Sequence, residues 1–589
     1  MRRTAIGSAA LGAAAILLLS ACGGGGDNGG GGTAAAEFDA GLTEVVNPGE
    51  ETGGTLRFAI TTNVESTDPG NIYYGYMWNF SRLYARTLYT YAAKPGDAGR
   101  EVVPDLAEGM PEVSDDGKTY TVKLKKGMKF EDGAEIVAED IKYAIARSNF
   151  GDKALPNGPK YYKEHLDAKG YEGVYEDKGD PLKGFDAIET PDDHTLVFHL
   201  KGAFADFPYV LVQPQSAPVP ADADTGERYM SSVVSSGPYK FEGDYQPGNG
   251  FTLVRNDEWD AESDPVRTAL PDKITVEEGI NQDEIDKRLA TGKLDVDLSG
   301  TGLGPAQKGK VFTDETAKAR LDNPENSAHY YLTINTQVKP FDNLACRQAV
   351  QYAMDRDAVH RAWGGDAGGT PATQILPPAV PGSNPDLDLY PSKNDDSKGD
   401  VEQAEKKLDE CGEGDGVKTN LGVRSDRPAE VAAAEAIQEG LKRAGIDVNI
   451  QQFPSDTFTN TQAGSPSFVH DKKLGLNIYG WMPDWPTGYG YFSQIVDGDA
   501  IKKAGNSNIS ELDDPEINKL LDEVVAIEDE DERNKVYAEI DKKVMEQAVI
   551  APMVFHKAVL YRPDNLTNVF FNPSWKMYDY ATLGTTAGE

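Results

Sequence analysis

The segment 113–147 restricts the possible fold more than any other stretch of the chain. A D-D-G turn signal precedes Tyr120 and Val122, which alternate with polar residues and so predict a strand with one buried face. An E-D-G turn then leads into a stretch in which Ile141 and Ile145 fall on one face of a helix. The order turn, strand, turn, helix favours an α/β fold.

Other segments repeat this combination of strands and helices. In the segment 515–527, Ile517, Leu521 and Val524 have helical spacing and predict a helix with one face in the core. The short aliphatic run 474–479 reads as a strand between helices. The chain of 589 residues is long enough for two to four structural units. We therefore expect a mixed-sheet α/β body.

The charge balance excludes several classes of function. The chain has 58 Lys and Arg against 96 Asp and Glu, a formal charge of -38. General nucleic-acid binding relies on an excess of basic residues, so we expect no nucleic-acid partner. Three Cys are too few for a disulfide-dense scaffold or an array of zinc fingers.

The order of motifs resembles that of bacterial extracellular solute-binding proteins of family 5. Segment 113–147 resembles the signature of that family, with its acidic-Gly turn, alternating strand, K-x-G-x-K-F-x-D-G stretch and helix. Later landmarks are S-G-P-Y at 236–239, P-F-D at 340–342 and G-W-M-P-D-W-P at 480–486. The resemblance covers roughly residues 53 to 573.

The resemblance implies a two-lobed, periplasmic-binding-protein-like α/β fold with a hinge between the lobes. The first lobe would comprise residues 53–329, including an inserted subdomain at about 90–230. The second lobe would comprise 330–550, and residues 551–589 would return to the first lobe. A ligand would be buried between lobes that close by hinge motion.

The N-terminus has the layout of an export signal. A basic head precedes an apolar run at 5–19 that is too short to span a bilayer comfortably, so we expect residues 1–21 to be a signal peptide. The sequence L-S-A-C resembles the bacterial lipobox, which implies a lipid on Cys22 and an anchor at the extracytoplasmic face of the cell membrane. The alternative is an ordinary signal peptide with Cys22 incidental. Residues 22–52 are Gly-rich and predict a flexible tether.

Motifs for catalysis and for metal binding are missing from the sequence. There is no G-x-S-x-G, H-E-x-x-H or P-loop motif, and His194 and His199 have a spacing that places them on opposite faces of a strand. We therefore expect no catalytic residue, metal ligand or cofactor. Without a P-loop, the chain cannot hydrolyse ATP to power the uptake of a solute, so uptake would need a permease and separate ATPase subunits.

The resemblance implies that the chain is the substrate-binding component of an ABC importer that captures oligopeptides, and we expect a monomer. Within the same class, the alternatives are binding of oligosaccharides or of nickel chelates. The alternative from another class is a secreted, anchored hydrolase, which the missing nucleophile motif disfavours.

The resemblance also suggests ligand-binding residues. In the peptide binders the Asp of G-W-x-x-D pairs with the ligand's α-ammonium group, which assigns this role to Asp484. Trp481 and Trp485 flank it as candidate apolar walls. The alternative is that Asp484 caps a turn. The aromatic residues Tyr73, Tyr74 and Trp78 are candidates for the first-lobe wall, with ordinary packing as the alternative.

Cys346 and Cys411 remain after Cys22 is assigned to the anchor. Both would face an oxidising exterior, and both lie in predicted helices or helix ends of the second lobe. We expect a disulfide between them; the alternative is two buried free thiols.

Overall fold

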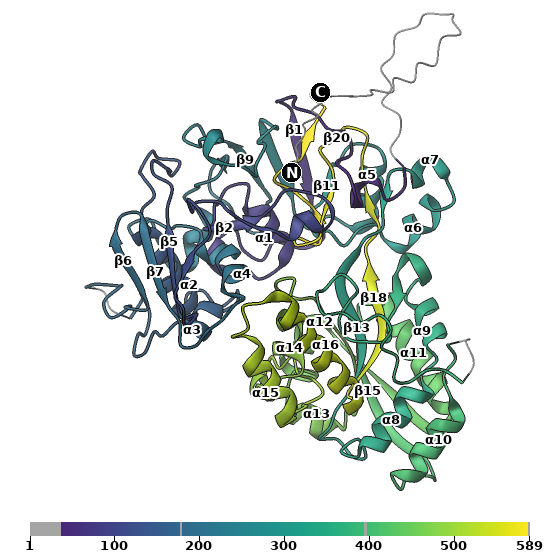
Figure 1. Cartoon of the computed structure of the whole chain (residues 1–589). Coiled ribbons are helices and arrows are strands. Elements are labelled where there is room, and N and C mark those ends of the chain that lie inside the picture. The colour runs from purple at the N-terminus through teal and green to yellow at the C-terminus, as the bar shows by residue number, and fades with distance from the viewer. Residues whose placement is uncertain (1–36, 177–178, 394–396, 587–589) are drawn as a thin grey trace, which may run out of the picture. The chain divides into compact units, whose positions relative to one another are not determined.

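Two sheets organise the chain, and each is the centre of one lobe (Figure 1). The structure is a computed structural model that describes residues 37–176, 179–393 and 397–586. These residues belong to one unit that begins near residue 36. Within this unit, we call the part around the sheet that contains β1 the first lobe and the part around the sheet that contains β13 the second lobe.

The first-lobe sheet has five strands in the order β11-β1-β10-β9-β8. Strand β1 pairs in parallel with β10 and β11, and β9 joins β10 and β8 in antiparallel pairs. Leu56 and Phe58 of β1 are fully buried. The strands are β1 (Thr55–Ala59), β8 (Tyr239–Phe241), β9 (Phe251–Arg255), β10 (Lys273–Glu277) and β11 (Val296–Asp297).

A four-stranded antiparallel sheet, β4-β5-β7-β6, forms the inserted subdomain, and α2 packs on it. Strand β5 buries Tyr120 and Val122 and leaves the intervening residues half-buried or exposed, which confirms the predicted alternation. The elements are β4 (Glu112–Val113), β5 (Thr119–Lys123), α2 (Ala138–Phe150), α3 (Tyr161–His165), β6 (Ile188–Asp192), β7 (Thr195–His199) and α4 (Phe207–Val212).

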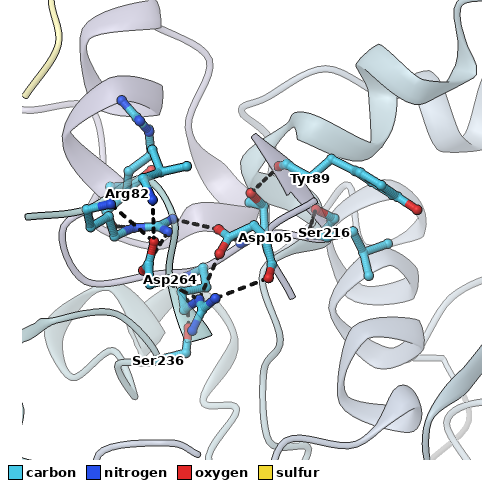
Figure 2. A network of polar contacts seen from close by, with 12 residues as sticks. Arg82, Tyr89, Asp105, Ser216, Ser236 and Asp264 are labelled. Carbon is cyan, nitrogen blue, oxygen red and sulfur yellow. Dashed lines mark hydrogen bonds and ion pairs between the residues drawn. The ribbon is translucent and has the colours of Figure 1, made fainter. Parts of the chain in front are cut away.

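A buried ion-pair network joins the chain around β2 (Tyr89–Tyr91) and β3 (Val102–Pro104) to the connection between β9 and β10 (Figure 2). Asp105 follows β3, the partner of β2, and its carboxylate pairs with Arg86 at 2.8 Å and with Arg267 at 2.7 Å. Arg267 also pairs with Asp264 at 3.0 Å in the connection between β9 and β10. Burial opposes ionisation of Asp105, but the two guanidinium groups outweigh it and lower the pKa of this carboxyl. The network therefore holds its charges in the ionised, paired state.

The second-lobe sheet has six strands in the order β14-β18-β13-β17-β15-β16, and helices cover both faces. Neighbouring residues of one strand enter different cores, since side chains alternate along a strand. Leu332 of β13 packs in the core with α8, α10 and α11, whereas Tyr331 packs in the core with α14, α15 and α16. The strands are β13 (Glu325–Ile334), β14 (Gly369–Pro371), β15 (Val417–Arg424), β16 (Ile446–Phe453), β17 (Leu476–Trp481) and β18 (Ile550–Lys557).

The helices of the second lobe follow the predicted periodicities. The helix expected at 515–527 is α15, which buries Ile517, Leu521 and Val524. The helices of this lobe are α8 (Leu344–Ala353), α9 (Arg356–Ala362), α10 (Val401–Glu410), α11 (Pro428–Arg443), α12 (Ser455–Thr457), α13 (Pro466–Lys472), α14 (Gly488–Ile495), α15 (Pro515–Val524) and α16 (Glu530–Gln547). A disulfide joins Cys346 in α8 to Cys411 at the end of α10, with the two Cα atoms 5.6 Å apart.

The chain returns to the first lobe after β18. Phe58 of β1 packs edge-to-face on Tyr580, with ring centroids 5.2 Å apart. The remaining elements are β2 (Tyr89–Tyr91) with β3 (Val102–Pro104), β12 (Leu321–Asp322) with β19 (Leu560–Tyr561), β20 (Leu566–Thr567) with β23 (Gly584–Thr585), β21 (Phe571–Asn572) with β22 (Met577–Tyr578), α1 (Gly75–Ser81), α5 (Gln282–Ala290), α6 (Pro305–Val311) and α7 (Glu315–Lys318).

The predicted tether differs from the structure in its C-terminal part. Residues 37–52 pack on the first lobe: Asp39 N–H donates to the Leu321 carbonyl at 2.9 Å, and Val46 forms a β-bridge with Val569. Phe38 stacks edge-to-face on Phe312 at 6.0 Å. The reason is that this stretch contains apolar side chains that the preceding Gly-rich stretch lacks. The predicted signal peptide at 1–21 and the predicted lipidation site Cys22 lie outside the described residues.

No helix in the described part of the chain combines the length and the apolar composition needed to cross a membrane.

Candidate ligand-binding site

A cavity of about 900 Å³ is lined by residues of both lobes. The first lobe contributes the chain after β1 and β11, the loop that leads into α1 and the turn before β22; the second lobe contributes parts of β13 and β18 and the chain after β15 and β17. Strands β1 and β11 run parallel, as do β15 and β17, so carboxyl ends of parallel strands meet the cavity from both sides. Such ends are the usual ligand-binding edge of an α/β sheet, and the volume suits a ligand of moderate size.

Asp484 lies on the cavity wall, three residues after the end of β17. The hydroxyls of Tyr161 and Tyr73 both donate to its Oδ2, the latter at 3.4 Å. Within the described chain no hydrogen bond reaches Oδ1, and no backbone N–H donates to this carboxylate. The contacts are therefore those of a held side chain in a cavity, and not those of a turn cap.

Burial dominates the electrostatics of Asp484. Desolvation raises the pKa of this carboxyl, while the hydrogen bond from Tyr161, the charge of Lys576 and the hydrogen bond from Tyr73 lower it. A partly desolvated carboxylate has most to gain from a cationic partner. The geometry thus leaves one oxygen of an acidic group available to a cation in the cavity.

Lys576 of the first lobe lies on the cavity wall beside Asp484 of the second lobe. It lies in the turn between β21 and β22, and its ammonium donates to the carbonyl of Pro483, the residue before Asp484. Desolvation lowers the pKa of Lys576 to about 8, and the charge of Asp484 acts in the opposite direction. A lysine and an aspartate from different lobes therefore lie near each other on the cavity wall.

Tyr73, Tyr74 and Trp78 line the first-lobe side of the cavity. The carboxylate of Glu65 accepts the backbone N–H groups of Tyr73 and Tyr74 at 2.7 and 3.2 Å, which fixes the loop. Trp78 packs edge-to-face on Tyr73 at 6.2 Å and donates its ring N–H to the Ile72 carbonyl at 3.3 Å. Tyr74 is 58% exposed, so its ring is free to contact a ligand.

The two tryptophans beside Asp484 have different positions. Trp481 lines the cavity and donates its ring N–H to the Gly490 carbonyl at 3.1 Å. Trp485 does not line it: the side chain is 1% exposed, donates to Asp206 Oδ2 at 2.9 Å and packs on Tyr161 at 4.8 Å. The prediction that Trp485 forms a ligand wall is therefore replaced by a supporting position behind Tyr161, since its ring faces the protein interior.

Two residues next to Asp484 were not found from the sequence: Lys576, which lines the cavity, and Tyr161, which contacts Asp484 without lining it. Tyr161 and Lys576 approach Asp484 from 323 and 92 positions away in the chain, and no local spacing relates them to it. Besides Asp484 and Lys576, the acidic and basic lining residues are Glu65, Asp426, Arg427 and His556. Burial lowers the pKa of His556 to about 4, so this imidazole is neutral at pH 7.

Comparison with protein families places the chain. The model of bacterial extracellular solute-binding proteins, family 5, matches residues 101–503, which is more than half of the sequence. The chain belongs to this family. The two-lobed α/β architecture is that of the family 5 proteins of known structure.

Curated family 5 relatives are similar over most of the chain. The oligopeptide-binding protein OppA of Bacillus subtilis is 26% identical and aligns over 80% of this chain and 83% of its own length. Heme-binding protein A of Haemophilus influenzae is 27% identical over 77% and 79%.

Solved structures agree with this fold. The structure of clavulanic acid biosynthesis oligopeptide binding protein 2 matches with a TM-score of 0.90 and 38% identity, over 94% of this chain and 99% of that one. The periplasmic binding protein DppA of Helicobacter pylori, in complex with the peptide STSA, matches with a TM-score of 0.68 and 22% identity over 90% and 98%, and supports the fold alone.

Proposed function

We propose that this family 5 protein is the lipid-anchored, extracytoplasmic receptor of an ABC importer, that it captures oligopeptides between its lobes and that it delivers them to a membrane permease driven by separate ATPase subunits. The observation that carries the proposal is Asp484, held by two tyrosine hydroxyls with its Oδ1 free in a cavity between the lobes. The names of similar proteins, an oligopeptide-binding protein among them, support the ligand class.

The binding step follows from this geometry. The α-ammonium group of a peptide would donate to Oδ1, while the hydrogen bonds from Tyr161 and Tyr73 orient the carboxylate through Oδ2 and favour its ionised form against desolvation. Aromatic rings of Tyr74 and Trp481 offer apolar surface to side chains without requiring one sequence. Closure of the lobes would then remove water from the ion pair and strengthen it.

Replacement of Asp484 tests the anchor. Asp484→Asn removes the charge and keeps the shape, so peptide affinity should fall by about 2 kcal/mol or more, roughly 30-fold, because the ammonium is left desolvated without a counter-charge. Isothermal titration calorimetry with a tripeptide such as Ala-Ala-Ala measures this loss. Asp115→Asn, in an exposed turn of the subdomain, is the matched control. Equal affinities of the wild type and Asp484→Asn would contradict the anchor.

An oligosaccharide is the second candidate ligand, because sugar rings stack on an aromatic lining such as this one and do not need Asp484 as a counter-charge. Native mass spectrometry of the protein as purified distinguishes the two. Retained masses spaced by amino-acid residues support peptide, hexose spacing would move the assignment to sugar, and a retained nickel chelate would move it to metal uptake. Cleaved peptides after incubation would instead indicate a hydrolase.

The lipid anchor rests on the sequence around Cys22 and needs its own test. In cells fed a radiolabelled fatty acid, the wild-type protein should carry label and fractionate with membranes. Cys22→Ala should lose both properties. Label on the variant would contradict a lipid on Cys22.

A further inference from the structure

Lys576 has a fixed backbone. It adopts a left-handed conformation, with φ of 64°, and its N–H donates to the Asn572 carbonyl at 2.7 Å. Asn572 is fully buried, and its side-chain amide donates to Ala92 O and Asp579 Oδ2. The preceding Trp575 is buried against the guanidinium of Arg82 at 4.6 Å. A lysine on such a turn is positioned by the fold and is not a mobile surface residue.

The ammonium of Lys576 uses only part of its hydrogen-bonding capacity. A lysine has three N–H donors, and within the described chain one acceptor, the Pro483 carbonyl, is in contact with them. The next residue, Asp484, likewise has one oxygen without a hydrogen bond. The cavity wall thus offers cationic donors and an anionic acceptor close together.

This pairing changes what Asp484 can bind. A ligand that brings only an α-ammonium group would place a second cation beside Lys576, and like charges in a desolvated site repel. A ligand that brings a carboxylate close to its α-ammonium group would satisfy both residues at once. The remaining charged side chains of the lining, Glu65, Asp426 and Arg427, lie on other segments, and within the described chain none of them forms a hydrogen bond or ion pair with Lys576.

We propose that Lys576 is a specificity-determining residue that selects ligands whose anchored end carries a carboxylate next to the α-ammonium group. Peptides that begin with Asp or Glu have this chemistry through their first side chain, and every free α-amino acid shares it through its α-carboxylate. The inference rests on the proposed peptide anchor at Asp484 and names the ligand class for it.

Calorimetry with matched tripeptides tests the selection. The wild-type protein should bind Glu-Ala-Ala at least about tenfold more tightly than Gln-Ala-Ala, which has the same shape without the charge. Lys576→Gln should abolish this preference. Lys576→Arg retains the cation and should keep the order of affinities. Lys94→Gln, an exposed first-lobe lysine outside the cavity lining, is the matched control.

The outcomes separate this inference from the proposed function. Binding of both peptides with equal affinity, or an unchanged preference in folded Lys576→Gln, would overturn the role of Lys576 and leave the peptide receptor intact. Binding of neither peptide would overturn both. A third probe, free glutamate, identifies the source: binding tighter than that of Glu-Ala-Ala and lost in Lys576→Gln supports selection at Lys576 and makes an amino acid the preferred ligand, whereas weaker binding supports a peptide. Thermal melting curves confirm that each variant is folded.

Discussion

Asp541 in α16 is a buried carboxyl outside the ligand site with a clear effect on stability. It accepts the backbone N–H groups of Ile375 and Leu376, each at 3.0 Å, and is fully buried. Desolvation raises its pKa to about 7, although the two hydrogen bonds act in the opposite direction. The folded protein therefore keeps a proton on Asp541 over a pH range in which the unfolded chain has lost it.

The pH dependence of unfolding tests this shift. The contribution of Asp541 to stability is fully present below about pH 4 and is lost as pH rises toward 7, with a slope of at most about 1.4 kcal/mol per pH unit. In urea unfolding, the free energy of the wild type minus that of Asp541→Asn should decrease from pH 4.5 to 6.5. The same difference for Asp115→Asn, an exposed carboxyl, should stay flat. A flat difference for Asp541 would contradict the raised pKa.

The sequence predicted individual residues of the site unevenly. The positions of Asp484 and Trp481 on the cavity wall agree with the prediction from the contiguous motif G-W-M-P-D, and their contact with a ligand stays a prediction. Tyr161 and Lys576 were not found, since each reaches Asp484 only through the folding of another lobe. The prediction that Trp485 lines the cavity was wrong, because its position next to Asp484 in the sequence does not determine the direction of its ring. Its ring N–H donates to Asp206, which lies on a distant segment of the chain.

At the scale of elements, the disulfide between α8 and α10 covalently links two helices of the second lobe. It closes a loop of 65 residues, and the chain-entropy model assigns such a loop about 4 kcal/mol. The double variant Cys346→Ser, Cys411→Ser should therefore unfold in urea with a free energy lower by up to that amount. Peptide mapping without reductant should recover the two cysteines linked; recovery of both as alkylatable thiols would contradict the bridge.

Elements with strong periodicity were predictable, and their placement was not. The alternation in β5 and the stripe of α15 are local properties, so the residues alone indicate them. The packing of residues 37–52 on the first lobe depends on partners near residues 321 and 569, which no local pattern reveals. The Gly-rich composition of residues 22–36 led to the prediction that the whole segment 22–52 is a tether, although residues 37–52 contain the apolar side chains that make this contact.

At the scale of the whole molecule, Asp206 connects the two lobes beside the ligand site. Its Oδ2 accepts the Trp485 ring N–H at 2.9 Å and the Thr487 hydroxyl at 2.6 Å. Asp206 precedes α4 of the first-lobe subdomain, whereas Thr487 precedes α14 of the second lobe. The two hydrogen bonds together are worth about 2 kcal/mol, so this contact ties the two lobes to each other.

Asp206→Ala should weaken closure. We expect peptide affinity to fall about 30-fold, equivalent to the loss of both bonds, and the decrease in radius of gyration on peptide addition to become smaller in small-angle X-ray scattering. Asp186→Ala, another aspartate of the subdomain that does not line the cavity, is the control. Wild-type affinity together with a wild-type change in scattering would show that Asp206 does not hold the lobes.

The β-bridge between Val46 and Val569 has a practical consequence for observing this motion. It brings both described ends of the chain onto the same lobe, so fluorophores attached near the two ends would report a constant distance however the protein opens. A useful pair of dyes needs one position inside the chain, for example at the exposed Lys406 of α10, with the second near residue 50. Energy transfer between these positions would follow the opening and closing of single molecules in real time.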